Sequence, residues 1–302
     1  MRLFEDPKYQ FIPNRKLGYM ISSVLVIISI GAIVFKGLQF GIDFRGGVEV
    51  VVAFEGSSPA VEDIRASLGE PLDGLPEVKT FGADVIIRTD ADLESSQIQS
   101  VVLSTMSSTF PDNPSEIIKA DLVGPRFAED LRNAALQSVL FALGIIFIYI
   151  LIRFKKWYYS AGAVAALAHD VIITLGMFTL LYEFVPFSLD IDQAIIAAFL
   201  TIVGYSLNDT VVVFDRIREN SLIFKTEDYD KMVNRSINNT LSRTVVTSVT
   251  TLIAVGILFF FGGEVLKGLS FALILGVILG TYSSIFVASS LLVDLQLKKA
   301  AK

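Results

Sequence analysis

Six apolar runs, each long enough to cross a lipid bilayer, dominate this sequence of 302 residues. A helix needs about 20 apolar residues to span the hydrocarbon core. The runs are, approximately, residues 17–35, 133–152, 159–181, 193–214, 244–261 and 269–293. A soluble chain with 53% hydrophobic and only 19% charged residues would lack the polar surface to cover its core. We therefore expect a polytopic α-helical membrane protein, with residues 133–293 forming a region of five helices after the first.

The first apolar run follows basic residues, as it would in a signal peptide. Arg2, Lys8, Arg15 and Lys16 precede it, and the run ends at Phe35 without a small-residue cleavage site. Because this length exceeds that of a typical signal sequence, we expect residues 1–16 to be an N-terminal segment and residues 17–35 to be a retained first span.

The charges of the short loops predict the orientation of the chain. Basic residues gather in three places: after the second run, after the fourth run, and in the tail at residues 294–302. They are Arg153, Lys155 and Lys156; Arg216, Arg218, Lys225, Lys231 and Arg235; and Lys298, Lys299 and Lys302. The loops on the other side carry mainly acids: Glu183, Asp190, Asp192 and Glu264, with Lys267. By the positive-inside rule, both termini are expected in the cytoplasm.

The one long connection, residues 36–132, reads as a folded domain on the outer, periplasmic side. Strands are expected at 48–54, 78–81, 85–88 and 116–123, and helices at 58–68 and 93–109, the first of them opening with a Ser58 cap and Pro59. This order is the split βαβ pattern of an α+β ferredoxin-like domain. The segment has no His, no Cys and no G-x-S-x-G motif. We expect a rigid body for binding or movement, and no enzyme.

An acid in the fourth run is the strongest functional candidate, because charges in the hydrocarbon cost about 2.5–3.5 kcal/mol. Asp209 shares a helical face with Tyr205 and Ser206 and could load and release a proton. The alternative is a structural acid that is hydrogen-bonded between helices. Arg243 begins the fifth run on the same side and would lower the pKa of a nearby acid, or it is an ordinary interfacial arginine.

His169 and Asp170, in the middle of the third run, are further candidates for a proton pathway. Histidine titrates near neutrality and a buried acid is costly. A neutral histidine that only bonds between spans is the competing interpretation.

Two glycine-containing patterns predict architecture. Gly276, Gly280 and Ser284 recur every fourth residue in the sixth run, which lets another helix approach closely. A second motif follows the first span: Gly41, Ile42, Asp43, Phe44, Arg45, Gly46 and Gly47. Its glycines predict a sharp turn, with a hinge as the functional alternative. It is no phosphate loop, since the strand follows the glycines.

Composition also limits the ligands. The chain has no cysteine, which excludes disulfides and thiolate metal sites, and we expect neither a metal nor a cofactor. No basic stripe alternates with aromatic residues, so nucleic acid is not an expected partner.

Several motifs together resemble the SecD/SecF family of bacterial protein translocase subunits, in its SecF branch. They are the motif at residues 41–47 and the segments at 168–172, 204–210 and 215–220. The similarity covers nearly the whole chain, including the six spans and one outward domain. SecD chains carry a much larger outward region.

This resemblance implies a component of the bacterial inner membrane that pairs with SecD, as two related halves of a transporter of the resistance-nodulation-division type. The pair would use the proton-motive force to complete export of preproteins that SecA drives through the SecYEG channel, with YajC and YidC as further partners. The family's proton-pathway acid falls on Asp209 and its arginine on Arg243. The competing hypotheses are a stand-alone proton-coupled exporter of lipids or small hydrophobic molecules, and a scaffold that only stabilises the translocon.

Overall fold

A computed structural model describes residues 7–72, 76–89 and 94–300, and the chain divides into two compact units. The helical unit comprises Met1–Leu38, Ser138–Leu180 and Ala194–Lys302, and the α+β unit comprises Gln39–Gln137 and Leu181–Gln193. Each unit has a hydrophobic core of its own.

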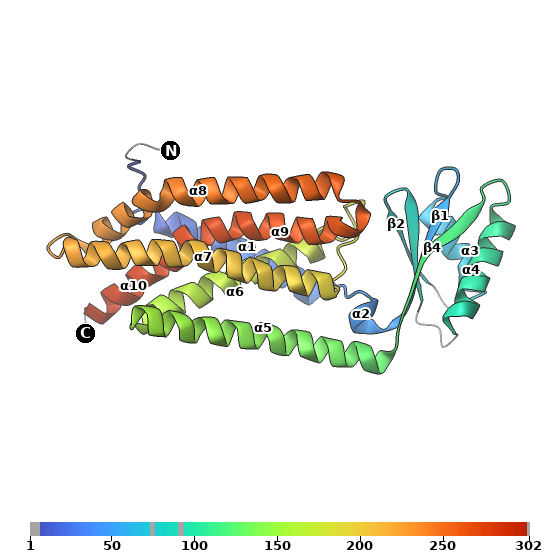
Figure 1. Cartoon of the computed structure of the whole chain (residues 1–302), viewed down its shortest axis with the longest axis horizontal. Coiled ribbons are helices and arrows are strands. Elements are labelled where there is room, and N and C mark those ends of the chain that lie inside the picture. The colour runs from blue at the N-terminus through green and yellow to red at the C-terminus, as the bar shows by residue number, and fades with distance from the viewer. Residues whose placement is uncertain (1–6, 73–75, 90–93, 301–302) are drawn as a thin grey trace. The chain divides into compact units, whose positions relative to one another are not determined.

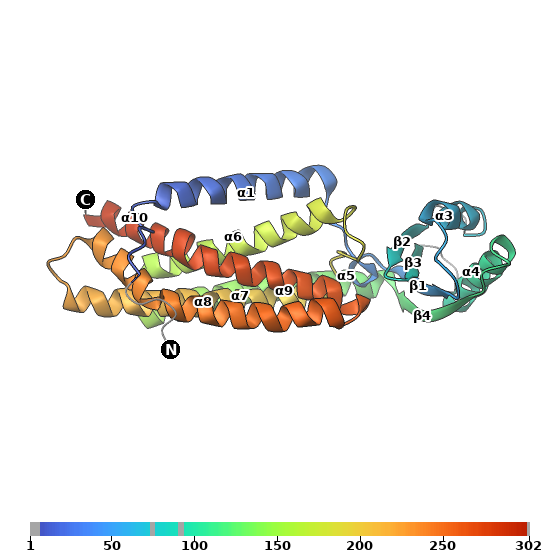
Figure 2. The same ribbon diagram turned by 90° about the horizontal axis from the view of Figure 1, so that it is seen from above.

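Within the described residues, six helical segments are long and apolar enough to cross a membrane (Figures 1 and 2). They are α1 (Arg15–Lys36), α5 (Pro125–Phe154), α6 (Trp157–Leu181), α7 (Gln193–Ile223), α8 (Tyr229–Phe261) and a sixth formed by α9 (Glu264–Ser283), η1 (Ser284–Ala288) and α10 (Ser289–Ala300). The prediction of a six-span helical membrane protein is confirmed.

α7 and α8 extend well beyond the apolar runs that predicted them, which ended at residue 214 and began at residue 244. The extensions look polar in sequence but hide a buried stripe that includes Ile217, Val233 and Ile237. Asn220 of α7 also donates a 2.8 Å hydrogen bond from Nδ2 to Oγ of Ser236 in α8. The two helices therefore continue as a packed pair past the apolar runs.

Burial differs sharply among the helices. Half of the most apolar stretch of α6 is buried, whereas only 6% of that stretch of α5 is buried. Close backbone approaches hold α6 in place: a Cβ at Gly176 would lie 2.2 Å from Ser29 of α1, and one at Gly162 would lie 2.9 Å from the Ala288 carbonyl. α6 is thus a central helix, and its polar side chains are enclosed by protein.

The sixth crossing is interrupted by one wide turn. η1 is a π-helix, in which carbonyls are paired five residues ahead instead of four. The Ser289 hydroxyl donates to the Ser284 carbonyl at 2.7 Å, which stabilises this turn. The sixth span expected over 269–293 lies within this crossing, and the wide turn falls inside it at Ser284–Ala288.

The α+β unit is a four-stranded antiparallel sheet with strand order β2-β3-β1-β4. Its elements in chain order are α2 (Ile42–Arg45), β1 (Gly47–Phe54), α3 (Val61–Gly69), β2 (Glu77–Phe81), β3 (Asp84–Thr89), α4 (Ser95–Thr109) and β4 (Ser115–Val123). Because β3 separates the parallel pair β1 and β2, this is the split βαβ arrangement that the sequence predicts.

The core of this unit forms between one face of the sheet and its two longer helices. Val48, Val50 and Val52 project from β1 toward one face because side chains alternate along a strand. They pack with Ile64 and Leu68 of α3, and the α4 residues Ile98, Val102 and Met106 complete the cluster at helical spacing.

Some predicted boundaries are wrong. The helix expected from Ser58 begins at Val61, because the Ser58 hydroxyl donates to the Ala83 carbonyl instead of capping the helix. The second helix begins at Ser95, behind a capping box between Glu94 and Gln97. Leu93, where it was expected to start, lies outside the described residues, as do Arg2 and Lys302. α5 starts at Pro125, eight residues before residue 133, with proline in its first turn.

Candidate functional site

Asp170 lies at the centre of a buried polar network that joins three helices. Its side chain is 1% exposed, and its Oδ2 accepts hydrogen bonds from Ser206 of α7 at 2.7 Å and Ser283 of α9 at 2.8 Å. Burying a carboxylate in a membrane is costly unless hydrogen bonds stabilise it. The two hydroxyls supply that stabilisation to one of its oxygens.

His169 completes this network on the other carboxylate oxygen. Its Nδ1 lies 2.9 Å from Oδ1 of Asp170, and its ring stacks on Tyr282 with centroids 6.1 Å apart. Among the described residues, its buried Nε2 has no hydrogen-bond partner. His169 and Asp170, which are neighbours in the sequence, therefore also contact each other through their side chains.

Asp209 lies on α7 one turn after Ser206 and is 3% exposed. The groups that act on its carboxylate are the Arg243 guanidinium and the Ser248 hydroxyl, both from α8. Arg243 is near enough to act through its charge, but the two do not form an ion pair within 4.0 Å. Within the described part of the chain, Oδ2 of Asp209 is buried without a hydrogen-bond partner.

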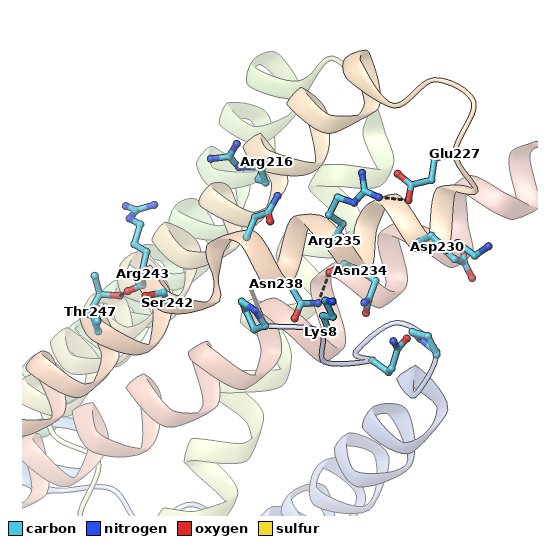
Figure 3. A pocket seen from close by; sticks show the side chains of 16 residues that line it. Lys8, Arg216, Glu227, Asp230, Asn234, Arg235, Asn238, Ser242, Arg243 and Thr247 are labelled. Carbon is cyan, nitrogen blue, oxygen red and sulfur yellow. Dashed lines mark hydrogen bonds and ion pairs between the residues drawn. The ribbon is translucent and has the colours of Figure 1, made fainter. Parts of the chain in front are cut away.

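Arg243 is exposed and lines a cavity of about 990 Å³ in the helical unit. Figure 3 shows Arg243 and Thr247 at one end of the cavity, with Arg235 and Asp230 toward the other. The N-terminal segment borders it and is held to α8 by Asn238, whose amide bonds both the N–H and the carbonyl of Tyr9. Polar, hydratable space thus reaches the arginine that acts on Asp209.

The cavity is mostly cationic. Five basic and two acidic residues line it: Lys8, Arg216, Lys231, Arg235, Arg243, Glu227 and Asp230. Both acids are paired, Glu227 with Arg235 at 2.9 Å and Asp230 with Arg15 at 3.1 Å. Two of the other bases are paired with acids outside the lining, Arg216 with Glu219 at 3.3 Å and Lys231 with Asp228 at 3.1 Å.

The small residues of the sixth crossing lie against α7. A Cβ at Gly276 would fall 2.2 Å from Ile202, and one at Gly280 would fall 2.8 Å from Ser206. Ser284 instead donates within its own helix, to the Thr281 carbonyl at 3.0 Å. Because Gly280 has no side chain, α9 lies close to α7, and Ser283 of α9 can donate to the same Asp170 oxygen as Ser206 of α7.

The glycine motif lies in the α+β unit and contains a short helical turn, α2, where the sequence predicts an irregular turn. Phe44 is buried, and Arg45 pairs with Glu77 at 3.4 Å. Gly46 and Gly47 have φ of +81° and +113°, values that favour glycine, and a Cβ at Gly46 would lie 3.1 Å from Pro125.

Several polar partners were not predicted: Ser206 as a donor to Asp170, Ser283, and Ser248. Serines in apolar runs were the available signal, but the pairing depends on which helices touch. Among the described residues, no group of three or more His, Asp and Glu side chains is arranged to hold a metal ion. The polar groups here are suited to holding and passing protons.

Comparisons with known proteins match nearly the whole chain. The model for "Protein export membrane protein SecD/SecF, C-terminal" matches residues 102–298, and that for the "SecD/SecF GG Motif" matches residues 31–57. A protein translocase subunit SecF from Rhodothermus marinus is 54% identical over 303 residues, covering 100% of this chain and 98% of the relative. The SecF subunit from Haemophilus influenzae is 42% identical, covering 97% and 88%.

Solved structures agree. The crystal structure of SecDF, a translocon-associated membrane protein from Thermus thermophilus, matches with a TM-score of 0.87 and 34% identity over 97% of this chain. A SecDF structure in a super-membrane-facing form matches with a TM-score of 0.72 over 99% of this chain. The chain spans 39% and 40% of those longer chains. On these matches, the chain belongs to the SecD/SecF family of protein export membrane proteins.

Proposed function

We propose that this chain is the SecF-type subunit of a Sec translocase and that, with a SecD-type partner, it uses the proton-motive force to promote preprotein export across the cytoplasmic membrane. Full-length similarity to relatives named protein translocase subunit SecF supports the assignment. The SecD-type partner is supported by SecDF, because this chain corresponds to 39% of that longer protein.

In this proposal both termini lie in the cytoplasm of a bacterium and the α+β domain lies outside. The ends of three segments meet at one end of the helical unit, since Arg15 contacts Asp230 of α8 and Asp294 of α10. Arg216 and Lys231 line the cavity beside Asp230. A single basic end supports a cytoplasmic assignment under the positive-inside rule.

The observation that carries the proton-driven part is a buried acid, Asp209, near enough to a cation on the next helix, Arg243, to be affected by its charge. When Asp209 binds a proton, its attraction to Arg243 is lost, and the preferred spacing of α7 and α8 changes. When it releases the proton, the attraction returns. Two states of this kind are what a cyclic motor requires.

Asp170 has a supporting role in this proposal. Ser206 donates to Asp170 and lies one turn from Asp209, on the same buried face of α7. Ser206 therefore places the Asp170 carboxylate beside α7, one turn before Asp209, and His169 lies on the far side of Asp170. A proton on Asp170 would change the hydrogen bonds that it accepts from Ser206 and Ser283, next to the turn that carries Asp209.

The energy available is sufficient. One elementary charge crossing 100 mV yields about 2.3 kcal/mol. Moving a two-state equilibrium from mostly one state to mostly the other needs about 5.5 kcal/mol. A few protons in each cycle would therefore be enough to move the α+β domain between two positions.

The test is preprotein translocation into inverted membrane vesicles, with and without a proton-motive force. We expect Asp209→Asn to remove the force-dependent acceleration, by about tenfold or more, while the subunit still assembles with its partner. Thr201→Val is the matched control. Thr201 is exposed on the same helix, and its hydroxyl donates to the Ala197 carbonyl one turn earlier, at 2.8 Å.

Unchanged translocation by Asp209→Asn would overturn the motor. A scaffold would keep its activity in this variant. An exporter of small hydrophobic molecules would lose its own transport and leave preprotein translocation untouched.

A further inference from the structure

The face of the sheet that points away from α3 and α4 carries a row of charges. Glu49 of β1 lies directly across from Arg88 of β3 and Asp121 of β4, and Arg88 lies across from Glu77 of β2. Such a face normally stays in water. Here Arg88 is only 10% and Glu49 only 11% exposed at the side chain, so another part of the α+β unit covers them.

The covering segment is Leu181–Gln193, which connects α6 to α7 and belongs to the α+β unit. Its Asp190 is 4% exposed and lies 2.8 Å from the Arg88 guanidinium and 3.6 Å from Nζ of Lys79. Arg88 pairs on its other side with Glu49 at 2.7 Å. Arg88 thus lies between two acids, and Lys79 lies between Asp190 and Glu77, the latter at 3.5 Å.

Tyr182 joins the same cluster from the other end of the segment. Its hydroxyl lies 2.7 Å from Oε1 of Glu77 and 2.8 Å from Oδ1 of Asp190, and its ring lies under Nζ of Lys79 at 3.0 Å. Ser188 also donates to Asp190. Both ends of the short segment are thereby held to the sheet through side chains.

Backbone bonds tie the segment to the glycine motif as well. Ile191 donates its N–H to the Gln39 carbonyl at 2.8 Å, and its carbonyl accepts from the Gly41 N–H at 3.0 Å. Asp43 accepts from the N–H of Gln193 at 3.0 Å, at the first residue of α7. The motif residues Gly41 and Asp43 are thus hydrogen-bonded to the backbone just before and at the start of α7, the fourth crossing.

We propose that Asp190 and Arg88 form a buried ionic lock that makes the segment Leu181–Gln193 a fixed part of the α+β domain, so that any displacement of the domain is passed directly to the ends of α6 and α7. These two helices carry Asp170 and Asp209. The coupling role rests on the proton-driven function proposed above, while the lock itself does not.

The physical reason is the cost of stranding a buried charge. Removing one partner of a buried ion pair leaves the other without water or a counter-charge, which is strongly unfavourable. If the segment left the sheet, Asp190 would lose both Arg88 and Lys79, and Arg88 would keep only Glu49 and the more distant Glu77. Burial would raise the pKa of Asp190, but the charges of Arg88 and Lys79 outweigh it and hold that pKa below its usual range. Asp190 is thus an anion at neutral pH.

The lock is tested first by hydrogen exchange on the full chain with its partner in lipid nanodiscs. The amides of Gly41 and Ile191 report directly on the segment. We expect Asp190→Asn to speed their exchange by about tenfold or more. Glu62→Gln is the control, because Glu62 is a 79% exposed acid of the same domain in a weak surface pair. Unchanged exchange in Asp190→Asn overturns the lock.

Coupling is tested by force-dependent translocation. Asp190→Asn is expected to lose most of the acceleration, and Tyr182→Phe, a milder change that keeps the charges, to lose a smaller part. A covalent tie should restore it: Phe40 and Ile191 form a parallel β-bridge, and neighbouring strands lie about 4.8 Å apart, within the range that a disulfide spans. Because the chain has no cysteine, Phe40→Cys with Ile191→Cys forms one defined bond.

The outcomes separate the two proposals. The triple variant combines Asp190→Asn with Phe40→Cys and Ile191→Cys. If its translocation is accelerated again when the disulfide is oxidised, but not when it is reduced, coupling through the segment is supported. Full acceleration in Asp190→Asn despite faster exchange overturns coupling and leaves the motor intact. Loss of coupling in Asp190→Asn together with full activity in Asp209→Asn overturns the proton-driven function, whereas the exchange result still decides the lock.

Discussion

Ser206 of α7 donates a 2.7 Å hydrogen bond to Oδ2 of Asp170 in α6, and Asp209 follows one turn later on the same helix. Ser206 therefore holds the Asp170 carboxylate against α7, one helical turn before Asp209. Gly280 of α9 permits this arrangement, because a Cβ there would lie 2.8 Å from Ser206.

Ser206→Ala is expected to lower the stability of the subunit by about 1–2 kcal/mol and to weaken force-dependent translocation. It removes one of two hydroxyl donors to a buried carboxylate oxygen, and Ser283 remains. Thermal unfolding of the purified complex and translocation into vesicles measure the two effects. Thr201→Val should change neither, and equal effects from both variants would contradict the role of Ser206.

Gly276→Ala is expected to destabilise the helical unit by about 1–3 kcal/mol, because the added methyl overpacks the contact between α9 and α7. Its Cβ would fall 2.2 Å from Ile202. Gly204→Ala is the control on α7, since nothing lies within 4 Å of a Cβ there. Thermal unfolding of the two variants in detergent should separate them clearly, and similar melting temperatures would be inconsistent with close packing.

The α+β domain should lose stability in acid partly through Asp190. The folded-state pKa of Asp190 lies below its unfolded value of about 3.9, so its contribution is present above that pH and is lost as the pH falls through the folded value. Asp190→Asn should therefore destabilise the domain by about 1.5–3 kcal/mol near neutrality, and the difference should narrow as the pH falls below about 3.9. Protease resistance of the domain in the full chain, followed from pH 7 to pH 2, measures this. A difference that stays constant with pH would argue against the ion pair.

Gly46→Ala is expected to destabilise the α+β unit by roughly 1–3 kcal/mol, because φ of +81° with extended ψ is a conformation that almost only glycine adopts. The new Cβ would also press on Pro125, at 3.1 Å. Gly124→Ala, which meets nothing within 4 Å, serves as the control. Hydrogen exchange in β1 compares them, and protection equal to that of Gly124→Ala would mean that the turn is not strained.

Much of the architecture could be predicted because it depends on local periodicity. Apolar runs of bilayer length gave six spans, and period-2 and period-3.6 patterns gave the order of strands and helices. Helix ends were predicted poorly. α7 continues to Ile223 through residues that look polar, because its buried partners, such as Val233, lie on another helix.

Contacts between distant residues could not be predicted. Asp190 looked like one of several acids in a short loop, yet its side chain is buried against Arg88, 102 positions earlier in the sequence. Asp170 was a candidate only because burying an acid in a membrane is costly. That Ser206 and Ser283 donate to it depends on which helices pack against α6, which the sequence does not state. A residue's type indicates that it needs a partner, and only the packing identifies that partner.

The single wide turn of η1 also sets the direction of everything after it. The π-turn accommodates one residue more than a regular turn, and a helix advances by about 100° for each residue. If all the residues of Ser284–Ala288 were kept but took regular α-helical geometry, α10 would therefore be rotated by roughly that angle. Asp294 would then move away from Arg15 and Tyr19, which it now contacts at 3.0 and 2.8 Å. The contact between the first and last helices thus depends on the geometry of this one turn, although every side chain of the contact lies outside it.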